Sequence, residues 1–303
     1  MTSHRPEVVF RGRRMPGDRA LVMAIVNRTP DSFYDKGATF ADTAALDAVD
    51  RAVAAGADIV DIGGVKAGEG PEVDVDEESR RVVPFVAEVR SRHPGLVISV
   101  DTWRHEVGRQ VCEAGADLLN DTWAGADPKL VEVAAEYGAG YVCSHVGGMP
   151  VRTDPYPAPT PERPFWPRYD DVVADVVAEL TAAAERTVAA GVPRGGVLVD
   201  PTFDFGKSTR HGLELLRHFD RLVATGWPVL VALSNKDLIG ETLDVEAHDR
   251  LAGTLAATAL AAHAGAAVFR AHNVRETREA VEAVANVEAG RGTARPLWTE
   301  SPE

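Results

Sequence analysis

The sequence predicts a single α/β domain folded as a (β/α)8 (TIM) barrel, and three observations support this fold class. Eight short apolar runs alternate with helical segments, several of those segments end in glycine, and the 303-residue length fits one barrel. Barrels of this type occupy about 250 residues. The composition, 45% hydrophobic and 26% charged, is that of an ordinary globular chain.

The strands are predicted from runs rich in β-branched and apolar residues. Their lengths suit parallel strands that are buried on both faces. The runs comprise residues 21–26, 59–62, 97–100, 117–119, 141–144, 197–199, 229–233 and 268–271.

The segments between these runs show helical spacing of apolar residues. One example is Leu46, Val49 and Val53, and the fragments at 54–62 (AAGADIVDI), 113–121 (EAGADLLND) and 264–272 (AGAAVFRAH) resemble one repeated unit. A glycine stands just before most of the next runs, where a left-handed helix cap costs nothing sterically. These glycines are Gly56, Gly115, Gly138, Gly191, Gly226 and Gly265. Right-handed crossovers then favour barrel closure, with a doubly wound open sheet as the alternative fold.

The chain divides into an N-terminal extension (residues 1–19), the barrel (20–290) and a C-terminal tail (291–303). The region 147–169 contains seven prolines, more than a regular element tolerates, and it is longer than a usual strand-to-helix connection. Either a lid over the site or a stiff surface excursion fits this composition equally well.

Charge and composition exclude several classes of function. The net charge of −14 repels phosphate backbones and anionic lipids, so we expect neither nucleic acid nor a membrane as partner. The sequence lacks an apolar run of about 20 residues, and its basic start lacks an apolar signal core, which predicts a cytoplasmic protein. Cys112 and Cys143 have no metal-ligand spacing and are expected to be buried, reduced thiols.

Polar side chains stand where the predicted strands end, which is where barrels of this class build their chemistry. Each one alone reads equally well as a helix cap or turn residue. That interpretation weakens because every strand ends this way and because the set includes Lys, Arg and His, which are poor caps. The set comprises Asn27, Asp61, Asp101, Asn120, His145, Asp200, Ser234, Lys236, Arg270 and His272.

Lysine is rare in this chain, and four of its five lysines, Lys36, Lys66, Lys207 and Lys236, fall in predicted loops after strands. This placement suits an anionic or phosphorylated ligand, with chance placement as the alternative. The acceptors of Asp101, Asn120 and Asp200 and the donors of Lys236 would satisfy a flat heterocycle with amino and carbonyl edges. Arg270 could lie on the face of such a ring.

Taken together, these motifs resemble the dihydropteroate synthase family, a barrel that joins a dihydropterin methylene to p-aminobenzoate with loss of pyrophosphate. The resemblance covers most of the chain, and its motifs follow one another in order. They are Asn27-Arg28-Thr29-Pro30-Asp31-Ser32-Phe33, Asp61-Ile62-Gly63-Gly64, Ser99-Val100-Asp101-Thr102, Asn120-Asp121, Asp200-Pro201, Phe205-Gly206-Lys207, Ser234-Asn235-Lys236 and Arg270-Ala271-His272.

The resemblance implies roles for individual residues. The pterin pocket would comprise Asp101, Asn120, Asp200 and Lys236 beneath Arg270, with Lys236, Asp101 and Asp200 as the catalytic residues. Asn27, His272 and Arg270 would hold the pyrophosphate, with Asn27 as the protein ligand of the Mg2+ cofactor. The resemblance also implies a pterin diphosphate substrate and a homodimer formed through the last helices.

The departures from the family pattern concentrate on the side of the second substrate, where Lys66, Phe205 and Asp237 are expected. Residues 65–70 (Val-Lys-Ala-Gly-Glu-Gly) stand where the family has Glu-Ser-Thr-Arg-Pro-Gly, and Lys66 cannot reproduce the bidentate contacts of an arginine. Asp237 replaces a serine that holds the aminobenzoate carboxylate, and the repulsion is expected to cost roughly 1 kcal/mol or more. The other changes are Asn235 for Arg, Asp204 for Gly, and the bulky Trp103 and Trp123.

Four functions follow from the sequence. The first is a paralogue that keeps the pterin pocket but has weak or absent p-aminobenzoate condensation. The second is a fully active synthase of folate biosynthesis, and the third is a non-catalytic pterin or folate binder or a regulatory protein. The fourth is a Schiff-base aldolase that uses Lys236, which ranks last because Asp200 and Asp237 would keep its amine protonated.

Overall fold

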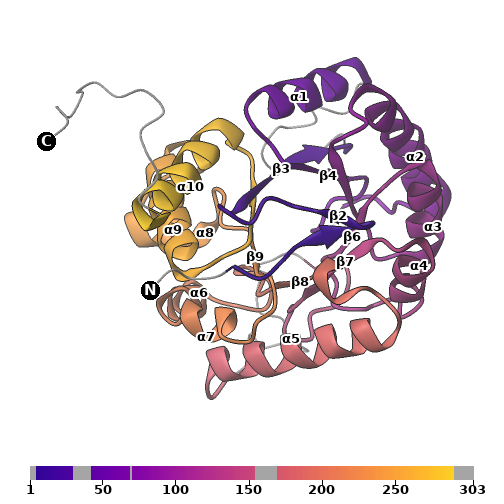
Figure 1. Ribbon diagram of the computed structural model, residues 1–303. Coiled ribbons are helices and arrows are strands. Elements are labelled where there is room, and N and C mark those ends of the chain that lie inside the picture. The colour runs from indigo at the N-terminus through magenta and orange to yellow at the C-terminus, as the bar shows by residue number, and fades with distance from the viewer. Residues whose placement is uncertain (1–4, 30–41, 69, 154–168, 290–303) are drawn as a thin grey trace, which may run out of the picture.

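The computed structural model describes residues 5–29, 42–68, 70–153 and 169–289 (Figure 1). Most of the proline-rich region 147–169 therefore lies outside the described residues, and so does Lys36. Among the described helices, none is both long and apolar enough to cross a membrane.

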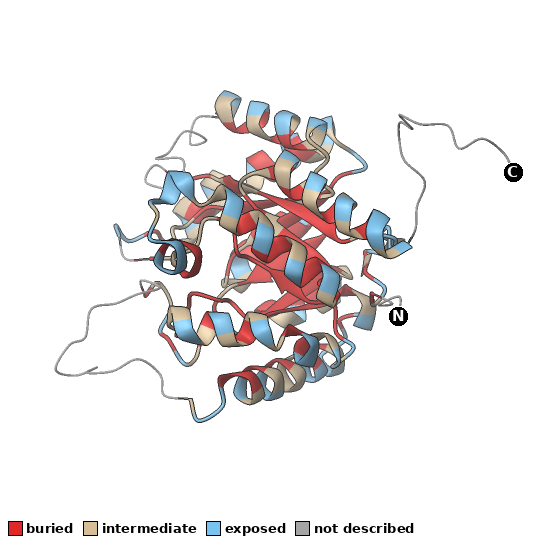
Figure 2. Ribbon diagram, turned by 90° about the vertical axis from the view of Figure 1, so that its left-hand side faces the viewer, coloured by how far each residue is buried: buried red, intermediate tan, exposed pale blue. Residues whose placement is uncertain are grey.

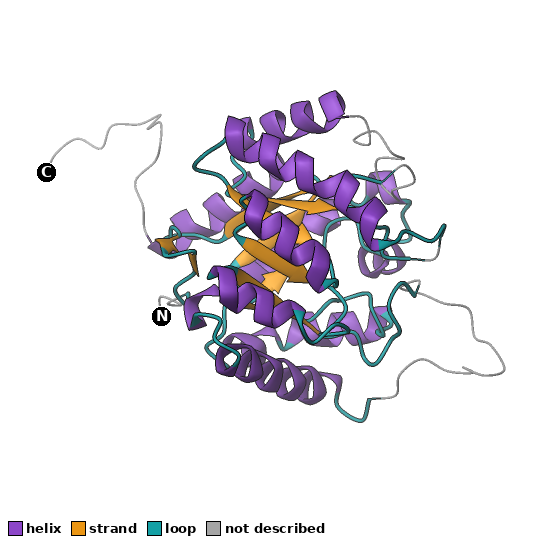
Figure 3. Cartoon of the chain, turned by 90° about the vertical axis from the view of Figure 1, so that its right-hand side faces the viewer, coloured by secondary structure: helices purple, strands orange, loops and turns teal. Residues whose placement is uncertain are grey.

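Eight parallel strands form the centre of the molecule and are surrounded by helices (Figures 1 and 3). Seven neighbouring pairs follow the order β8-β7-β6-β5-β4-β3-β10-β9. A parallel bridge between Val199 and Val229 closes the ring, and the Val199 N–H donates to the Pro228 carbonyl at 3.0 Å. This closure confirms the barrel and rules out the open doubly wound sheet. The strands are β3 (Leu21–Asn27), β4 (Ile59–Gly63), β5 (Val97–Asp101), β6 (Leu118–Asp121), β7 (Gly140–Ser144), β8 (Val197–Asp200), β9 (Leu230–Val231) and β10 (Val268–Ala271).

The predicted strands agree with the observed ones except at the closing seam. The run 229–233 was expected to form one strand of five residues, but β9 comprises only Leu230–Val231. β9 pairs with β10 over two residues and meets β8 only through the single bridge, so little of the run has a ladder partner. The chain then turns, and the Lys236 N–H donates to the Leu233 carbonyl at 3.3 Å.

The helices lie on the outside of the strands and alternate with them along the chain. Six predicted glycine positions have the left-handed backbone that favours glycine, with φ between 61° at Gly138 and 112° at Gly115. The α-helices are α1 (Asp42–Ala54), α2 (Val75–Arg92), α3 (His105–Ala114), α4 (Leu130–Tyr137), α5 (Val172–Ala189), α6 (Thr209–Arg217), α7 (Phe219–Val223), α8 (Asp237–Leu243), α9 (Leu251–Ala264) and α10 (Val274–Ala289). Short 3-10 turns are η1 (Arg194–Gly196) and η2 (Ala247–Asp249).

Two apolar cores hold the barrel together, and Figure 2 shows that the strands are almost entirely buried. The larger core fills the space between strands and helices. The smaller one fills the barrel interior near the start of the strands, where Leu21, Ile59 and Leu118 meet. An antiparallel hairpin, β1 (Val9–Phe10) with β2 (Arg13–Arg14), lies across this end, and its Phe10 is fully buried in the interior core. The hairpin thus closes the amino-terminal mouth, leaving the carboxyl ends of the strands for the site.

Both cysteines are buried and free, as expected. Burial raises the pKa of each thiol to about 12, so both stay protonated and unreactive.

Candidate functional site

Asp61 is the centre of a hydrogen-bonded polar cluster at the carboxyl ends of the strands. Its carboxylate is fully buried and accepts from the Ser99 hydroxyl at 2.6 Å, from Asn120 Nδ2 at 3.2 Å and from Arg270 Nε at 2.6 Å. These four residues come from β4, β5, β6 and β10. A buried carboxylate is stable only when it is paired in this way, so Asp61 fixes the positions of Asn120 and Arg270.

Asp101 shares the same arginine. Arg270 Nη2 donates to Asp101 Oδ2 at 3.3 Å, and the Thr122 hydroxyl donates to Asp101 Oδ1 at 3.1 Å. Burial raises the pKa of Asp101 to about 7, because it outweighs the lowering by Arg270 and because Asp61 raises it further. For Arg270 itself, burial opposes the charged form, yet Asp61 and Asp101 keep its pKa above the ordinary value. These bonds use the edge of the guanidinium rather than its face.

One acceptor in this cluster has no protein partner. Asn120 is 2% exposed, and among the described residues its Oδ1 receives no hydrogen bond. An unpaired buried acceptor costs roughly 1–3 kcal/mol, which a ligand N–H would recover.

The predicted Lys236 lies at the same mouth but is paired inside the protein. Its ammonium donates to Asp204 Oδ2, and Asp204 is almost fully buried. The direct contact of the amine is therefore with Asp204, whereas Asp200 and Lys236 interact through their charges and Asp237 pairs with Arg250. Asp200 accepts the Thr202 N–H at 2.7 Å. Burial raises the pKa of Asp200 to about 6, opposed by the Thr202 N–H and aided by Asp204.

The backbone beside these residues is strained. Thr202 has φ of 42° and Asn235 has φ of 58°, both in the left-handed region that non-glycine residues rarely adopt. The two positions follow β8 and β9, the strands at the closing seam. Strained residues of this kind cluster at ligand sites, where the surrounding structure holds them in place.

Asn27 and His272 end neighbouring strands and lie beside this cluster. A Cβ built on Gly63 would be 3.8 Å from the Asp101 Cβ and 3.9 Å from Asn27 Oδ1, so Gly63 separates these two side chains. His272 Nδ1 lies 3.2 Å from the Ser234 hydroxyl. Burial, followed by the charges of Arg270 and Lys236, lowers the pKa of His272 to about 3, which keeps its ring neutral.

The side expected for a second substrate is apolar and tightly packed. Phe205 meets Trp123 edge to face, with centroids 5.1 Å apart, and Lys236 Nζ lies 6.0 Å from the Phe205 centroid. This mouth cluster comprises Trp123, Val146, Met149 and Phe205, with Ala67, Trp103 and Val151 packed against it. Lys66 lies next to Ala67 in the loop after β4 and is partly buried.

Asp237 differs from the expectation in one respect. It is the first residue of α8, whose cap residue is Lys236 and which has no side-chain cap. Arg250 Nη1 donates to Asp237 Oδ1 at 2.6 Å and to the Asn235 carbonyl at 2.9 Å. This pairing offsets part of the negative charge and weakens the predicted repulsion of a second carboxylate.

Lys207 does not serve a ligand, contrary to the argument from lysine placement. It is fully buried, and its ammonium donates to the carbonyls of His145, Thr202 and Phe205 at 2.8 to 3.0 Å. Burial lowers its pKa to about 7. Its role is to fix the loops after β7 and β8.

Sequence reasoning also missed two residues. Asp61 was recognised at a strand end but was assigned no role, although Ser99, a second polar residue inside a buried strand, signalled its partner. Asp204 was recognised only as a replacement for glycine, and no signal in the sequence identified Lys236 as its partner.

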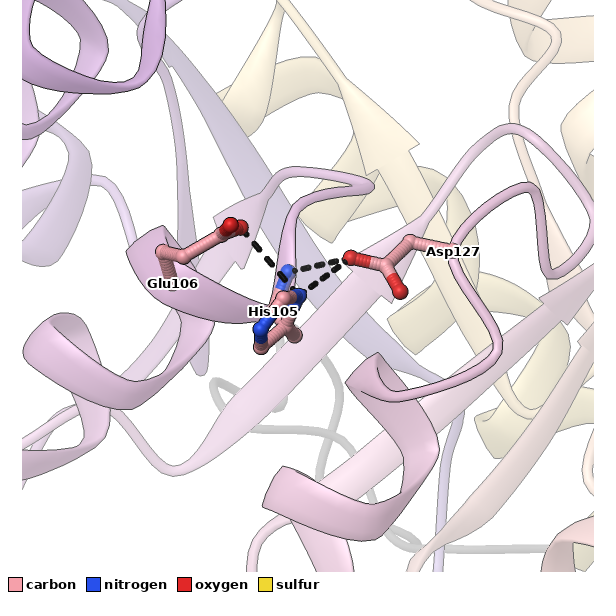
Figure 4. Close-up of side chains that lie close together, drawn as sticks. All are labelled: His105, Glu106 and Asp127. Atoms are coloured by element: carbon pink, nitrogen blue, oxygen red, sulfur yellow. Dashed lines mark hydrogen bonds and ion pairs between the residues drawn. The ribbon is translucent and has the colours of Figure 1, made fainter.

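A second group of acidic residues and histidine lies at the start of α3 and in the loop after β6 (Figure 4). His105 Nδ1 is 2.6 Å from Asp127 Oδ2 and 3.2 Å from Glu106 Oε2. Asp127 Oδ2 also accepts the His105 backbone N–H at 2.9 Å. Asp127 therefore satisfies the start of α3, which explains this group structurally.

Comparisons with known proteins identify the family of this chain. The sequence pattern of the family described as pterin binding enzyme matches residues 23–272. A Mycobacterium tuberculosis protein named inactive dihydropteroate synthase 2 is 60% identical over 94% of this chain and 88% of its own length.

Solved structures support the same relationship. The Mycobacterium tuberculosis protein Rv1207 is 50% identical, with a TM-score of 0.72 over 94% of this chain and 99% of that one. Yersinia pestis dihydropteroate synthase with a sulfonamide drug is 34% identical, with a TM-score of 0.85 over 94% of this chain and 100% of that one. The chain therefore belongs to the pterin-binding enzyme family, as a divergent relative of the dihydropteroate synthases.

Proposed function

We propose that this protein binds a pterin in a dihydropteroate-synthase-type pocket but condenses it with p-aminobenzoate weakly or not at all. The observation that carries the impaired condensation is the ion pair between Lys236 and Asp204, because it engages the lysine for which the resemblance implies a catalytic role. A substrate that needs this lysine must first break a partly buried ion pair, and doing so leaves Asp204 without its partner.

Pterin binding is supported by the polar cluster around Asp61. Asn120 Oδ1 is a buried acceptor for a ring N–H or amino group. Asp101 and Asp200 add carboxyl groups whose raised pKa values, about 7 and about 6, let either group donate or accept near neutral pH. The face of the Arg270 guanidinium suits stacking on a flat ring.

Impaired condensation is supported by the second-substrate side. Asp237 is the first residue of α8, where the resemblance implies a serine that holds the carboxylate of p-aminobenzoate, and Arg250 offsets only part of its charge. Lys66 supplies a point charge in place of an arginine fork. The relative named inactive dihydropteroate synthase 2, at 60% identity, agrees with this reading.

The residues present fit a Mg2+ ion that arrives with the pyrophosphate group. Asn27 would supply one amide oxygen, and substrate phosphates and water would supply the rest, which is the all-oxygen set that Mg2+ prefers. His272 and Arg270 would contact the phosphates. Bound Mg2+ would neutralise the charge of the leaving group.

A homodimer and a cytoplasmic location stay predictions from the sequence. Two exposed apolar side chains, Leu260 on α9 and Val287 on α10, favour a dimer through the last helices.

The other functions have less support. A fully active synthase would require the Lys236 pair to open at little cost. A Schiff-base aldolase is disfavoured because the Lys236 amine is already engaged by the buried Asp204 carboxylate. A non-catalytic binder differs from a weak enzyme only in turnover.

Two measurements test the proposal. Calorimetry measures the binding of a pterin diphosphate with and without Mg2+, and an assay with p-aminobenzoate measures turnover. We expect saturable pterin binding and turnover well below about 1 per second, and turnover at or above that rate would contradict the impairment.

Asp204→Gly should free Lys236 and tighten pterin diphosphate binding by about tenfold, whereas the exposed Asp220→Ser control should not. Asp237→Ser tests the second substrate, since it should improve p-aminobenzoate use without changing pterin affinity.

If Asp204→Gly leaves pterin affinity unchanged, the ion pair does not limit the pocket. If the native protein binds no pterin, the proposed function is wrong as a whole.

A further inference from the structure

We infer that His145, Asp175 and Glu179 form a divalent-metal site of the zinc type, separate from the pterin pocket. His145 follows β7 directly, and the two carboxylates stand four residues apart on α5, so one face of that helix presents both to the imidazole. One ligand atom from each residue lies within 4.8 Å of the other two.

The separations match a metal polyhedron. His145 Nε2 lies 3.2 Å from Glu179 Oε2 and 3.5 Å from Asp175 Oδ2. Zinc bonds of about 2.0–2.1 Å at tetrahedral angles separate neighbouring ligands by roughly 3.3 Å. His145 Nε2 therefore already stands at the spacing of a neighbouring ligand from each of the two carboxylate oxygens.

A second observation points to a ligand at this place. His145 is 1% exposed, yet within the part of the chain that the structure describes neither ring nitrogen has a hydrogen-bond partner. The two carboxylate oxygens are close but accept no hydrogen bond from the ring. A buried nitrogen without a partner is unfavourable, and a metal ion would satisfy Nε2.

Two cations lie near these ligands. Lys207 and Arg186 both act electrostatically on Glu179, and the Lys207 ammonium donates to the His145 carbonyl at 2.8 Å. A divalent ion at this place would therefore depend on the His145 nitrogen as well as on the two carboxylates.

The site has access to solvent and to a cavity. The Asp175 and Glu179 side chains are 46% and 62% exposed. Glu179 and Ser144 line a cavity of about 780 Å3 bounded by α4 and α5, and the buried Ser144 hydroxyl has no hydrogen-bond partner among the described residues. Three protein ligands leave one zinc position for water or an anionic ligand from this cavity.

The group at His105 provides the contrast within the same chain. Its histidine and Asp127 already bond to each other, and Asp127 also satisfies the backbone of α3 (Figure 4). We assign no metal to it, and its exposed Glu106 offers a matched control.

The test uses the full chain after chelator treatment, titrated calorimetrically with Zn2+ alone and followed with Co2+ by visible absorption. We expect one saturable site and a higher melting temperature with Zn2+. Glu179→Gln and Asp175→Asn change exposed side chains and should leave the fold intact while weakening Zn2+ binding at least about tenfold. Glu106→Gln should leave it unchanged.

The absence of saturable Zn2+ binding would overturn the site. Equal weakening by Glu106→Gln and Glu179→Gln would also overturn it, because binding would then follow general surface charge. Pterin binding by the native protein is measured separately and does not depend on either result.

Discussion

At the scale of single residues, this site is arranged so that most of its charges are satisfied within the protein. Arg270 pairs with both Asp61 and Asp101, Lys236 pairs with Asp204, and Arg250 pairs with Asp237. The unpaired Asn120 Oδ1 is an exception. A ligand therefore gains little from new charge pairs and much from hydrogen bonding to Asn120 and from stacking.

The raised pKa of Asp101 predicts a pH-dependent effect on stability. Its pKa is about 7 in the folded protein, whereas the ordinary value of such a carboxyl, expected in the unfolded chain, is 3.8. Between these two pH values the folded chain holds more protons than the unfolded one. Folding is then favoured by this group at low pH, and its contribution is lost as pH rises through 7. Asp101→Asn removes the titration while Asp61 still pairs with Arg270.

Between pH 5 and pH 8, the free energy of unfolding of the variant should rise by at least about 1 kcal/mol relative to that of the native protein. Urea unfolding at both pH values measures this difference. A difference between the two proteins that does not change with pH would show that Asp101 is ionised throughout.

At the scale of elements, the amino-terminal hairpin replaces side chains that the strands cannot supply. The interior core needs a plug where the strands begin, and β1 provides Phe10, which lies among the first residues of the barrel strands. Phe10 also lies close to the β7 glycine, because a Cβ on Gly140 would come within 2.7 Å of its ring. The hairpin and the small residue at Gly140 thus fit each other.

Phe10→Ala is expected to lower the free energy of unfolding by about 3–5 kcal/mol, because it leaves a cavity in a closed core. Pterin binding by the folded variant should be unchanged, since the hairpin lies at the opposite mouth from the site. Urea denaturation and calorimetry measure the two effects. Arg14→Ala, which removes a side chain that is 75% exposed, is the control and should change neither.

At the scale of the whole molecule, the sequence predicted the strands and helices, which local patterns determine. It did not predict the side-chain contacts that form when the barrel closes. Buried parallel strands read as continuous apolar runs, so seven of the eight were located closely, and β9 was overestimated because closure leaves it few ladder partners. The polar side chains at the carboxyl ends of the strands were predicted from the same runs. The pair of Asp204 with Lys236 could not be predicted, because the loops after β8 and β9 meet only at the closing seam.

The predicted homodimer is also a property of the whole molecule. Leu260 is 63% exposed and Val287 is 83% exposed, on helices that pack against each other. Burial of one such side chain contributes about 1.5–3 kcal/mol. A two-fold interface buries the same side chain in both subunits, so each residue contributes once per subunit. Leu260→Glu combined with Val287→Glu should therefore reduce the mass measured by light scattering from twice the 32.4 kDa chain to one chain. Ser91→Glu, which adds charge on α2 across the barrel from α9 (Figure 1), should leave the mass unchanged. A native protein that already measures 32.4 kDa would show that these side chains are exposed in a monomer.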